Sequence, residues 1–175
     1  AGCTAGKGRK IMCGIAGFIA GHGAANAAAL APMLARIAHR GPDGQGTFVE
    51  GPAALGHCRL AIIDLEGGAQ PLYSEDKNLV VVFNGEIYNY RDLRAPLMEE
   101  GVEFRTNSEI EVIVALYRKY GDEFITRLRG MFAILIYDAV EKTVFVGRDP
   151  FGIKPMYYRE TEKGLMFASE MKAFL

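Results

Sequence analysis

The chain has 175 residues, of which half are hydrophobic and 23% are charged, and this balance excludes intrinsic disorder over most of its length. Its 20 basic and 21 acidic residues leave a formal charge of −1, so it lacks the basic excess that is typical of a nucleic-acid-binding protein. No apolar run approaches the ~20 residues of a membrane-spanning helix, and the first residues lack the apolar stretch of a secretory signal. We therefore expect a soluble, cytoplasmic protein.

Residues 1–12 differ in composition from the rest. They contain Gly, Ala and three basic residues but no acidic one, and this composition predicts no packed structure. We interpret them as a disposable leader (a remnant of cloning, a translated upstream stretch or a propeptide) that precedes one domain at residues 13–175. The sequence of residues 169–175 is typical of the first turn of a helix. Because the chain ends there, we expect that it is cut from a longer protein.

Strand and helix patterns alternate irregularly along the domain. Apolar runs and period-two patterns predict strands at residues 13–18, 47–50, 54–63, 79–83, 131–137, 143–148, 156–159 and 165–169. Helical periodicity predicts helices at residues 27–39, 91–100, 108–120 and 122–128. Because short turns separate the late strands, we expect them to pair antiparallel. Antiparallel sheets with a few amphipathic helices indicate a layered α+β fold and not a doubly wound parallel sheet.

The predicted helices carry recognisable start signals. Asn26 and Asn89 are candidate N-caps of the first two helices, and Ser108 with Glu111 three residues later forms a capping box. Pro32 fits its helix only if it lies in about the first turn.

Several standard sites can be excluded. The segment Gly2–Gly8 lacks the spacer and the hydroxyl residue of a phosphate-binding loop. No Cys-x-x-Cys pair and no His pair at ligand spacing occurs. His57 and Cys58 are adjacent, so on a strand they face opposite sides and cannot share a metal ion. We therefore expect no metal site.

Two short segments have both a structural and a chemical interpretation. Cys13 is either a buried structural cysteine or a nucleophile, and removal of Met12 would give it a free α-amine to act as the base for its thiol. The Asn84-Gly85 pair is typical of a type I′ hairpin turn. The same pair could also supply a carboxamide and a backbone N–H to an oxyanion hole.

Two charged residues have similar alternatives. Arg59 lies within an apolar run, which favours an interaction with a carboxylate of the protein or of a substrate. Glu109 opens the third predicted helix, where an acidic side chain favours the helix dipole. Because the capping box uses Glu111, Glu109 is freer to face a ligand.

A series of motifs extends in order from residue 12 to the end. They are Met12–Phe18, His39–Gly44, Gly56–Leu60, Gly68–Leu72, Asn84–Asn89, Gly147–Pro155 and Ser169–Ala173. Together they resemble the glutamine amidotransferase domain of the N-terminal-nucleophile class, as found at the head of glutamine-dependent asparagine synthetases. Related amidotransferases usually lack a Pro-Asp pair after His-Arg-Gly. Pro42 and Asp43 therefore favour the asparagine synthetase branch. The resemblance implies a four-layer αββα sandwich of two antiparallel sheets.

The resemblance also implies roles for individual residues. Cys13 would attack the side-chain amide of glutamine and form a thioester, while Asn84 and the N–H of Gly85 would hold the oxyanion. The implied substrate-binding residues are Arg59, Ile62, Glu86 and Glu109. Arg59 would bind the α-carboxylate of glutamine, and the two glutamates its α-amino group. Glu109 stands where the family usually has Asp and is one methylene longer, so we expect it to bind the α-amine of glutamine less well than Asp would.

The expected function is glutamine hydrolysis that supplies ammonia to an asparagine-synthetase-type amidation. We expect no cofactor in this domain, with ATP and Mg²⁺ used only by a C-terminal synthetase domain, which would act in cis or in trans. Nucleic acid and membrane are not expected partners, and oligomerisation is left open. Three alternatives remain: another ammonia acceptor, a glutamine-binding module without turnover, and a thiol enzyme that pairs Cys13 with His39 or His57.

Overall fold

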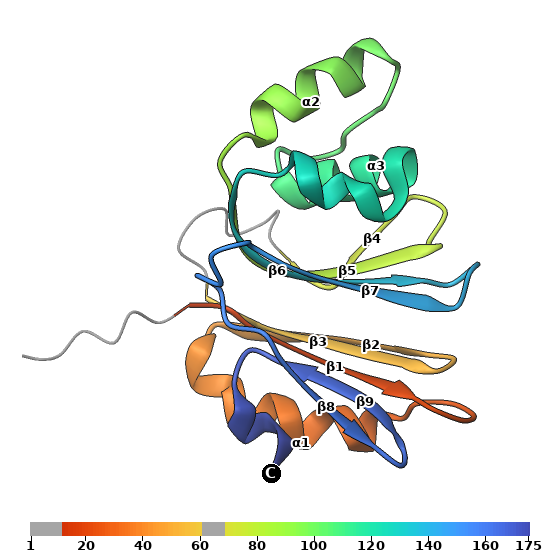
Figure 1. The fold of residues 1–175 in the computed structure, drawn as a ribbon, viewed down its shortest axis with the longest axis vertical. Coiled ribbons are helices and arrows are strands. Elements are labelled where there is room, and N and C mark those ends of the chain that lie inside the picture. Colours follow the sequence, from red (N-terminus) through yellow and green to blue (C-terminus); the bar gives the residue numbers. More distant parts are fainter. Residues whose placement is uncertain (1–11, 61–68) are drawn as a thin grey trace, which may run out of the picture.

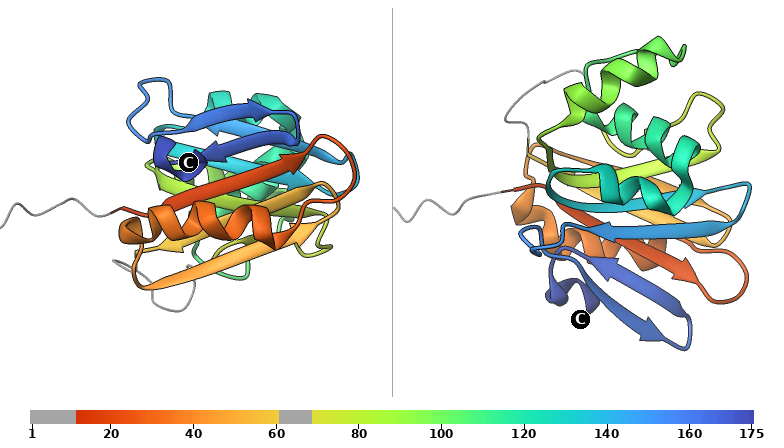
Figure 2. Two further views of the ribbon diagram at one scale, coloured as in Figure 1. Left: turned by 90° about the horizontal axis from the view of Figure 1, so that it is seen from below. Right: turned by 45° about the horizontal axis from the view of Figure 1, so that its top comes forward.

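Two antiparallel sheets stack face to face, and helices cover the outer face of each sheet (Figure 1). The computed structural model describes residues 12–60 and 69–175. The right-hand view of Figure 2 shows the same helix–sheet–sheet–helix arrangement, and the left-hand view, from below, shows α1 lying across the first sheet. The expected α+β sandwich is thereby confirmed. None of the helices in these two ranges is long and apolar enough to span a membrane.

The first sheet contains the beginning and the end of the described chain. Its strands are β1 (Gly14–Ala20), β2 (Gly44–Glu50), β3 (Ala53–Arg59), β8 (Tyr157–Thr161) and β9 (Gly164–Ala168). Their order is β2-β3-β1-β9-β8, so β1 lies at the centre. The outer face is covered by α1 (Ala27–Ile37) and the short 3₁₀ helices η1 (Ala38–Arg40) and η3 (Met171–Phe174).

The second sheet is formed by the middle of the chain. Its strands, in spatial order, are β4 (Leu72–Tyr73), β5 (Leu79–Ile87), β6 (Gly130–Asp138) and β7 (Thr143–Arg148). Its outer face carries α3 (Glu109–Tyr120) and the 3₁₀ helix η2 (Gly121–Arg127), and α2 (Tyr90–Glu99) packs against α3 (Figure 1). Strand β4 is an element that the sequence patterns did not predict.

Side-chain alternation divides the hydrophobic core into three layers. On β1, Ile15 points between the two sheets, whereas Ala16 faces α1. On β5, Val80 and Val82 point between the sheets, whereas Val81 faces the layer of α3. The period of two along each strand therefore decides which side chains reach the space between the sheets.

The expectation that the late strands pair antiparallel is confirmed for two pairs of strands but not for β7 with β8. β6 pairs with β7 and β8 pairs with β9, and both pairings are antiparallel. However, β7 and β8 belong to different sheets, so residues 149–156 cross from one sheet to the other. The predicted strand 54–63 ends at Arg59, and residues 61–63 lie outside the described residues.

Helix α1 begins as predicted but tolerates an interior proline. The Asn26 Oδ1 accepts a hydrogen bond from the N–H of Ala29 at 3.0 Å, which confirms the N-cap. Pro32 is the sixth residue of the helix, so the expectation that it must lie near the first turn was wrong. The helix persists because its apolar side buries Leu30, Met33, Leu34 and Ile37 against the first sheet.

The other two start signals act differently from the predictions. Asn89 precedes α2 but makes no side-chain cap; its side chain instead bonds the backbone of Arg127 and Arg129. Ser108 caps α3 by accepting from the N–H of Ile110. Glu111 accepts hydrogen bonds from the segment before Ser108 and not from Ser108 itself. The capping box is therefore only half formed.

Candidate functional site

Cys13 lies directly before β1, at the end of the first sheet where β3 finishes. Because Gly14 pairs with Cys58 on β3, Cys13 lies beside the end of that strand. The backbone N–H of Leu60 donates to the Cys13 Sγ at 3.4 Å, and the carbonyl oxygen of Leu60 lies 3.8 Å from the same sulfur. The thiol is partly exposed, so it is held in place yet accessible.

Asn84 and Gly85 lie within β5 and not in a turn. Asn84 pairs with Ala133 and Gly85 with Phe132 on β6, so the prediction of a type I′ hairpin was wrong. Asn84 shares the strand face of Val80 and Val82, which points between the sheets. It is only 2% exposed, and its Nδ2 has no hydrogen-bond partner among the described residues. The site therefore contains a buried amide donor that is free to bind a ligand.

The N–H of Gly85 points to the edge of β5 that faces away from β6. Backbone N–H groups alternate between the two edges of an antiparallel strand. On this edge the N–H of Phe83 donates to Gln70 Oε1 and that of Ile87 donates to Glu109 Oε2, each at 2.6 Å. The Gly85 N–H lies between them. A Cβ at Gly85 would lie 2.1 Å from the carbonyl oxygen of Met131, so only glycine fits.

Arg59 ends β3 on the same side of the sandwich as Cys13. It shares its strand face with Leu55 and His57, so it points toward the space between the sheets. Its side chain is partly buried, and its carbonyl oxygen accepts from the N–H of Asp43. Ile62, the other predicted contact on this segment, lies outside the described residues.

Glu86 and Glu109 bring two carboxylates together at the end of β5. Glu86 is exposed on β5, while Glu109 opens α3 and is partly buried. Burial raises the pKa of Glu109 to about 7, and the nearby charge of Glu86 adds to the rise, although the N–H of Ile87 acts in the opposite direction. Glu109 thus changes its charge near neutral pH.

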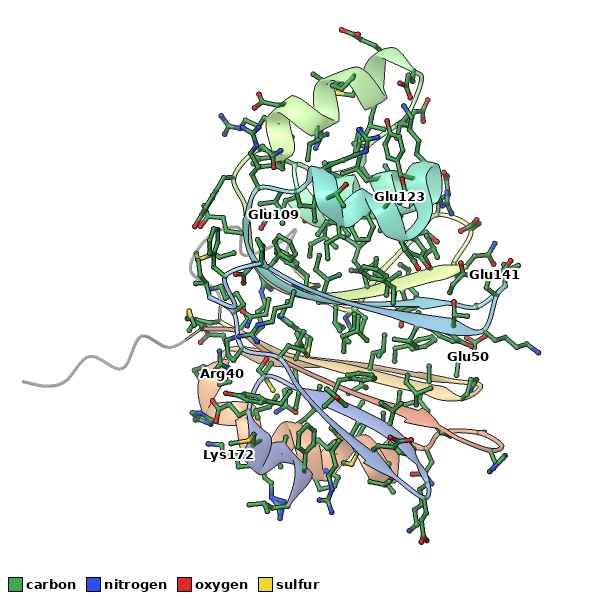
Figure 3. All side chains as sticks on the ribbon, in the orientation of Figure 1. Arg40, Glu50, Glu109, Glu123, Glu141 and Lys172 are labelled. Atoms are coloured by element: carbon green, nitrogen blue, oxygen red, sulfur yellow. The ribbon has the colours of Figure 1, made fainter. Side chains whose placement is uncertain are left out.

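Arg40 belongs to this end of the molecule, although the sequence analysis assigned it no role. Its Nε donates to the carbonyl oxygen of Cys13 at 3.1 Å, and one terminal nitrogen forms an ion pair with Glu170 at 2.9 Å. In Figure 3, Arg40 and Glu109 lie at one end of the sandwich and Glu141 lies at the other. The motif at residues 39–44 was the available signal, but sequence spacing alone could not connect it with Cys13.

Neither candidate histidine contacts the Cys13 thiol within the described part of the chain. His39 is exposed and its Nε2 lies 3.0 Å from a carboxylate oxygen of Glu170. His57 is 1% exposed, and burial, assisted by Arg59, lowers its pKa to about 4. A neutral, buried His57 and a His39 engaged elsewhere do not favour the Cys–His alternative.

No group of three or more candidate metal ligands occurs in residues 12–60 and 69–175. What the site does contain is a thiol, a buried amide donor, a guanidinium group and two carboxylates. A nucleophile beside hydrogen-bond donors suits attack on a carbonyl carbon. The separate charged groups suit a substrate with both an amino and a carboxylate group.

Comparisons with known proteins agree with this chemistry. A model of the glutamine amidotransferase domain family matches residues 12–175. Glutamine-hydrolyzing asparagine synthetase 1 of Bacillus subtilis is 44% identical over 168 residues, which cover 94% of this chain and 27% of that protein. Asparagine synthetase B of Escherichia coli is 46% identical over 138 residues, or 78% of this chain and 25% of that protein. The chain thus spans about a quarter of the length of these relatives.

A solved structure shares the fold. The glutamine phosphoribosylpyrophosphate amidotransferase of Bacillus subtilis, solved with ADP and GMP, aligns with a TM-score of 0.77 and 27% identity. The alignment covers 93% of this chain and 43% of that one. The similarity therefore extends over almost the whole sandwich.

Proposed function

This chain belongs to the family of glutamine amidotransferase domains, and on that premise we propose that it hydrolyses glutamine to glutamate and ammonia through a thioester on Cys13. Two observations carry the proposal: the Cys13 thiol is held by the Leu60 N–H and stays partly exposed, and the buried Asn84 Nδ2, on the face of β5 that points between the sheets, has no hydrogen-bond partner among the described residues. No cofactor is needed for this reaction, because the thiol and the protein's own donors supply the chemistry.

The proposed reaction starts from a chain in which Cys13 is the first residue. The Cys13 sulfur attacks the side-chain amide carbon of glutamine, and its proton moves to the free α-amine of the same residue. Asn84 Nδ2 and the Gly85 N–H donate to the oxyanion. The α-amine then passes the proton to the leaving nitrogen, ammonia departs, and water hydrolyses the thioester to release glutamate.

We propose that charged residues at the same end orient the substrate. Arg59 binds the α-carboxylate of glutamine, and Glu86 and Glu109 bind its α-amino group. The support for this assignment is the opposite sign of the two sets of groups and their origin: Arg59 ends β3 of the first sheet, whereas Glu86 lies on β5 of the second sheet and Glu109 on α3, which covers that sheet.

The test is an assay of glutamate and ammonia release by a chain that begins at Cys13. We expect equal amounts of both products, and an intact-mass measurement after acid quenching should show a glutamyl adduct on Cys13. The variant Cys13→Ala should lose turnover but still bind glutamine. Cys58→Ala is the matched control, because Cys58 packs under α1 and burial raises its thiol pKa to about 11. Full activity of Cys13→Ala would refute the proposal.

We further propose that the ammonia serves an asparagine-synthetase-type amidation in a C-terminal synthetase domain. The support is that the relatives are named asparagine synthetases and are more than three times as long as this chain. ATP and Mg²⁺ would be bound by that domain. Incubation of this chain with glutamine, aspartate and ATP should therefore yield glutamate but no asparagine, and detection of asparagine would contradict the assignment.

A further inference from the structure

The segment after β7 holds one lysine rigidly at the start of β1. The Asp149 carboxylate accepts hydrogen bonds from the N–H of Ile153 at 2.8 Å and of Lys154 at 2.9 Å. From the other side, Arg148 Nε donates to the carbonyl oxygen of Lys154 at 2.8 Å. Both backbone polar groups of Lys154 are therefore fixed, so its side chain starts from a defined position.

The ammonium group of Lys154 is buried beside Met12, the residue that precedes the nucleophile. Lys154 is only 5% exposed, and its Nζ lies 3.0 Å from the Met12 Sδ, a weak hydrogen-bond acceptor. Within residues 12–60 and 69–175, no carboxylate oxygen lies within 4.0 Å of this nitrogen. A buried ammonium without an ion pair is costly, which indicates that something other than fold stability favours it.

The charged groups around Lys154 come from several elements. Burial lowers the pKa of Lys154, and Arg40 on η1 adds to this effect. The Cys13 thiol, Glu86 on β5 and Asp149 act in the opposite direction.

Arg40 brings a second positive charge to Cys13, but an ion pair with Glu170 partly neutralises it. Lys154 thus supplies a positive charge that forms no ion pair within the described residues, although Glu86 and Asp149 offset it in part.

We propose that Lys154 is a positioning residue for the reaction, and that its buried ammonium favours the deprotonated, reactive form of Cys13. The inference rests on the proposed function of Cys13. A positive charge near a cysteine stabilises the thiolate relative to the thiol. Lys154 acts through its charge alone and takes no part in the proton transfers from the thiol to the Cys13 α-amine and from there to ammonia.

The first experiment measures the alkylation rate of Cys13 by iodoacetamide against pH. It uses the full 175-residue chain and quantifies the Cys13 peptide by mass spectrometry. Lys154→Met removes the charge and keeps the length of the side chain, and Lys154→Arg keeps the charge. Lys163→Met is the matched control, because Lys163 is exposed beside Gly164, which pairs with Ala20 at the far end of β1.

In Lys154→Met, half-maximal alkylation of Cys13 should occur at a pH about one unit higher than in the wild type. Near pH 7 the alkylation of this variant should therefore be about tenfold slower. Lys154→Arg and Lys163→Met should follow the wild type. Coincident profiles of Lys154→Met and wild type would overturn the proposal. If the Met variant does not fold, Lys154→Gln, which is also neutral, takes its place.

The second experiment measures kcat/KM for glutamine against pH in chains that begin at Cys13. In Lys154→Met, the acidic side of the profile should move to higher pH. At alkaline pH its kcat/KM should return to the wild-type value. A uniform loss at every pH with an unchanged alkylation profile would indicate a purely structural role and refute the proposal. If the wild type shows no glutamine turnover while the alkylation shift is present, the proposed function fails but the effect of Lys154 on Cys13 stands.

Discussion

Asn84 offers amide N–H groups in a layer that is filled mainly by apolar side chains such as Val82 and Ile15. A donor that is already desolvated and fixed by its strand needs little reorganisation when negative charge develops on the substrate. The unpaired Nδ2 lowers the stability of the folded protein even before substrate binds. Such an arrangement favours the transition state over the free substrate.

Replacement of Asn84 by alanine should therefore reduce kcat by roughly 10²–10³, the effect of losing one oxyanion donor. The KM for glutamine should change much less, because the donor acts mainly on the developing charge. Steady-state glutaminase kinetics check this prediction. Asn78→Ala is a suitable control, since Asn78 precedes β5 at the end opposite to Asn84 and bonds Asp76 in an exposed turn. Equal kinetics for both variants would contradict the assignment.

Glu109 should make glutamine binding dependent on pH near neutrality. Its pKa is raised to about 7, mainly by burial, so its carboxylate is ionised above this pH and protonated below it. Only the ionised form attracts the α-ammonium group of glutamine, so the KM should fall as the pH rises from about 6 to about 8. Measurement of KM across this range tests the prediction.

The variant Glu109→Gln isolates the contribution of this carboxylate. Glutamine cannot ionise, yet its side-chain oxygen can still accept from the N–H of Ile87. The variant should have a higher KM that no longer varies between pH 6 and 8. If the variant keeps the pH dependence of the wild type, another group causes it, and Glu109 is only a helix-start carboxylate.

At the scale of elements, the segment after β7 depends on one buried carboxylate. Asp149 accepts from three backbone N–H groups, including that of Phe132 at 3.3 Å on β6. Burial opposes ionisation, but these donors outweigh it and lower the pKa of Asp149. Its stabilising effect is therefore present above the ordinary carboxyl pKa of about 3.9 and is lost as the pH falls through the lower folded-state value.

Asp149→Ala should lower the free energy of unfolding by about 3 kcal/mol at pH 7, because buried N–H groups lose their acceptor. Denaturant unfolding monitored by circular dichroism measures this change. Asp138→Ala is the matched control, since Asp138 accepts from two N–H groups in an exposed turn, where water can replace it. We expect a loss below about 1 kcal/mol for the control. A similar small loss for Asp149→Ala would refute the prediction.

The elements that the sequence predicted well are those whose signals are local. The continuous apolar run of β5 reflects burial of both faces of the strand, and the helical periodicity of α3 reflects burial of one face. In both elements burial leaves a direct trace in the residue pattern. Asn84-Gly85 was different, because the choice between a turn and a continuous strand depends on pairing with β6, which is distant in sequence. Asn89 likewise bonds Arg127 and Arg129, about 40 residues away, instead of capping its own helix.

The candidate site was predictable in its residue types but not in its supporting contacts. Cys13 and Asn84 were proposed as site residues because their motifs resemble a known family and because their chemistry suits acyl transfer. Arg40 and Lys154 lay in quoted motifs without a role, since their contacts with Cys13 and Met12 span 27 and 142 residues. Contacts of this kind leave no periodic signal, so only the folded structure reveals them.

At the scale of the whole molecule, the site exists because two sheets end together. β1 and β3 supply Cys13 and Arg59 from one sheet, and β5 supplies Asn84 from the other. The crossing segment with Lys154 then connects the second sheet to the first at the same end. A small-molecule site that lies between two sheets depends on how the sheets stack. It therefore depends on the hydrophobic layer between them.

The state of the N-terminus should decide whether this assembled site is active. We expect a chain that retains residues 1–12 to be inactive, because a peptide bond converts the Cys13 α-amine into an amide that is not basic near neutral pH. In that chain the Met12 side chain also lies against Lys154 at the nucleophile. A chain that begins at Cys13 should turn over glutamine under the same conditions. N-terminal sequencing of an active preparation checks this prediction, and activity from a chain that still begins Ala1-Gly2-Cys3 would overturn the free-amine mechanism in favour of a Cys–His pair.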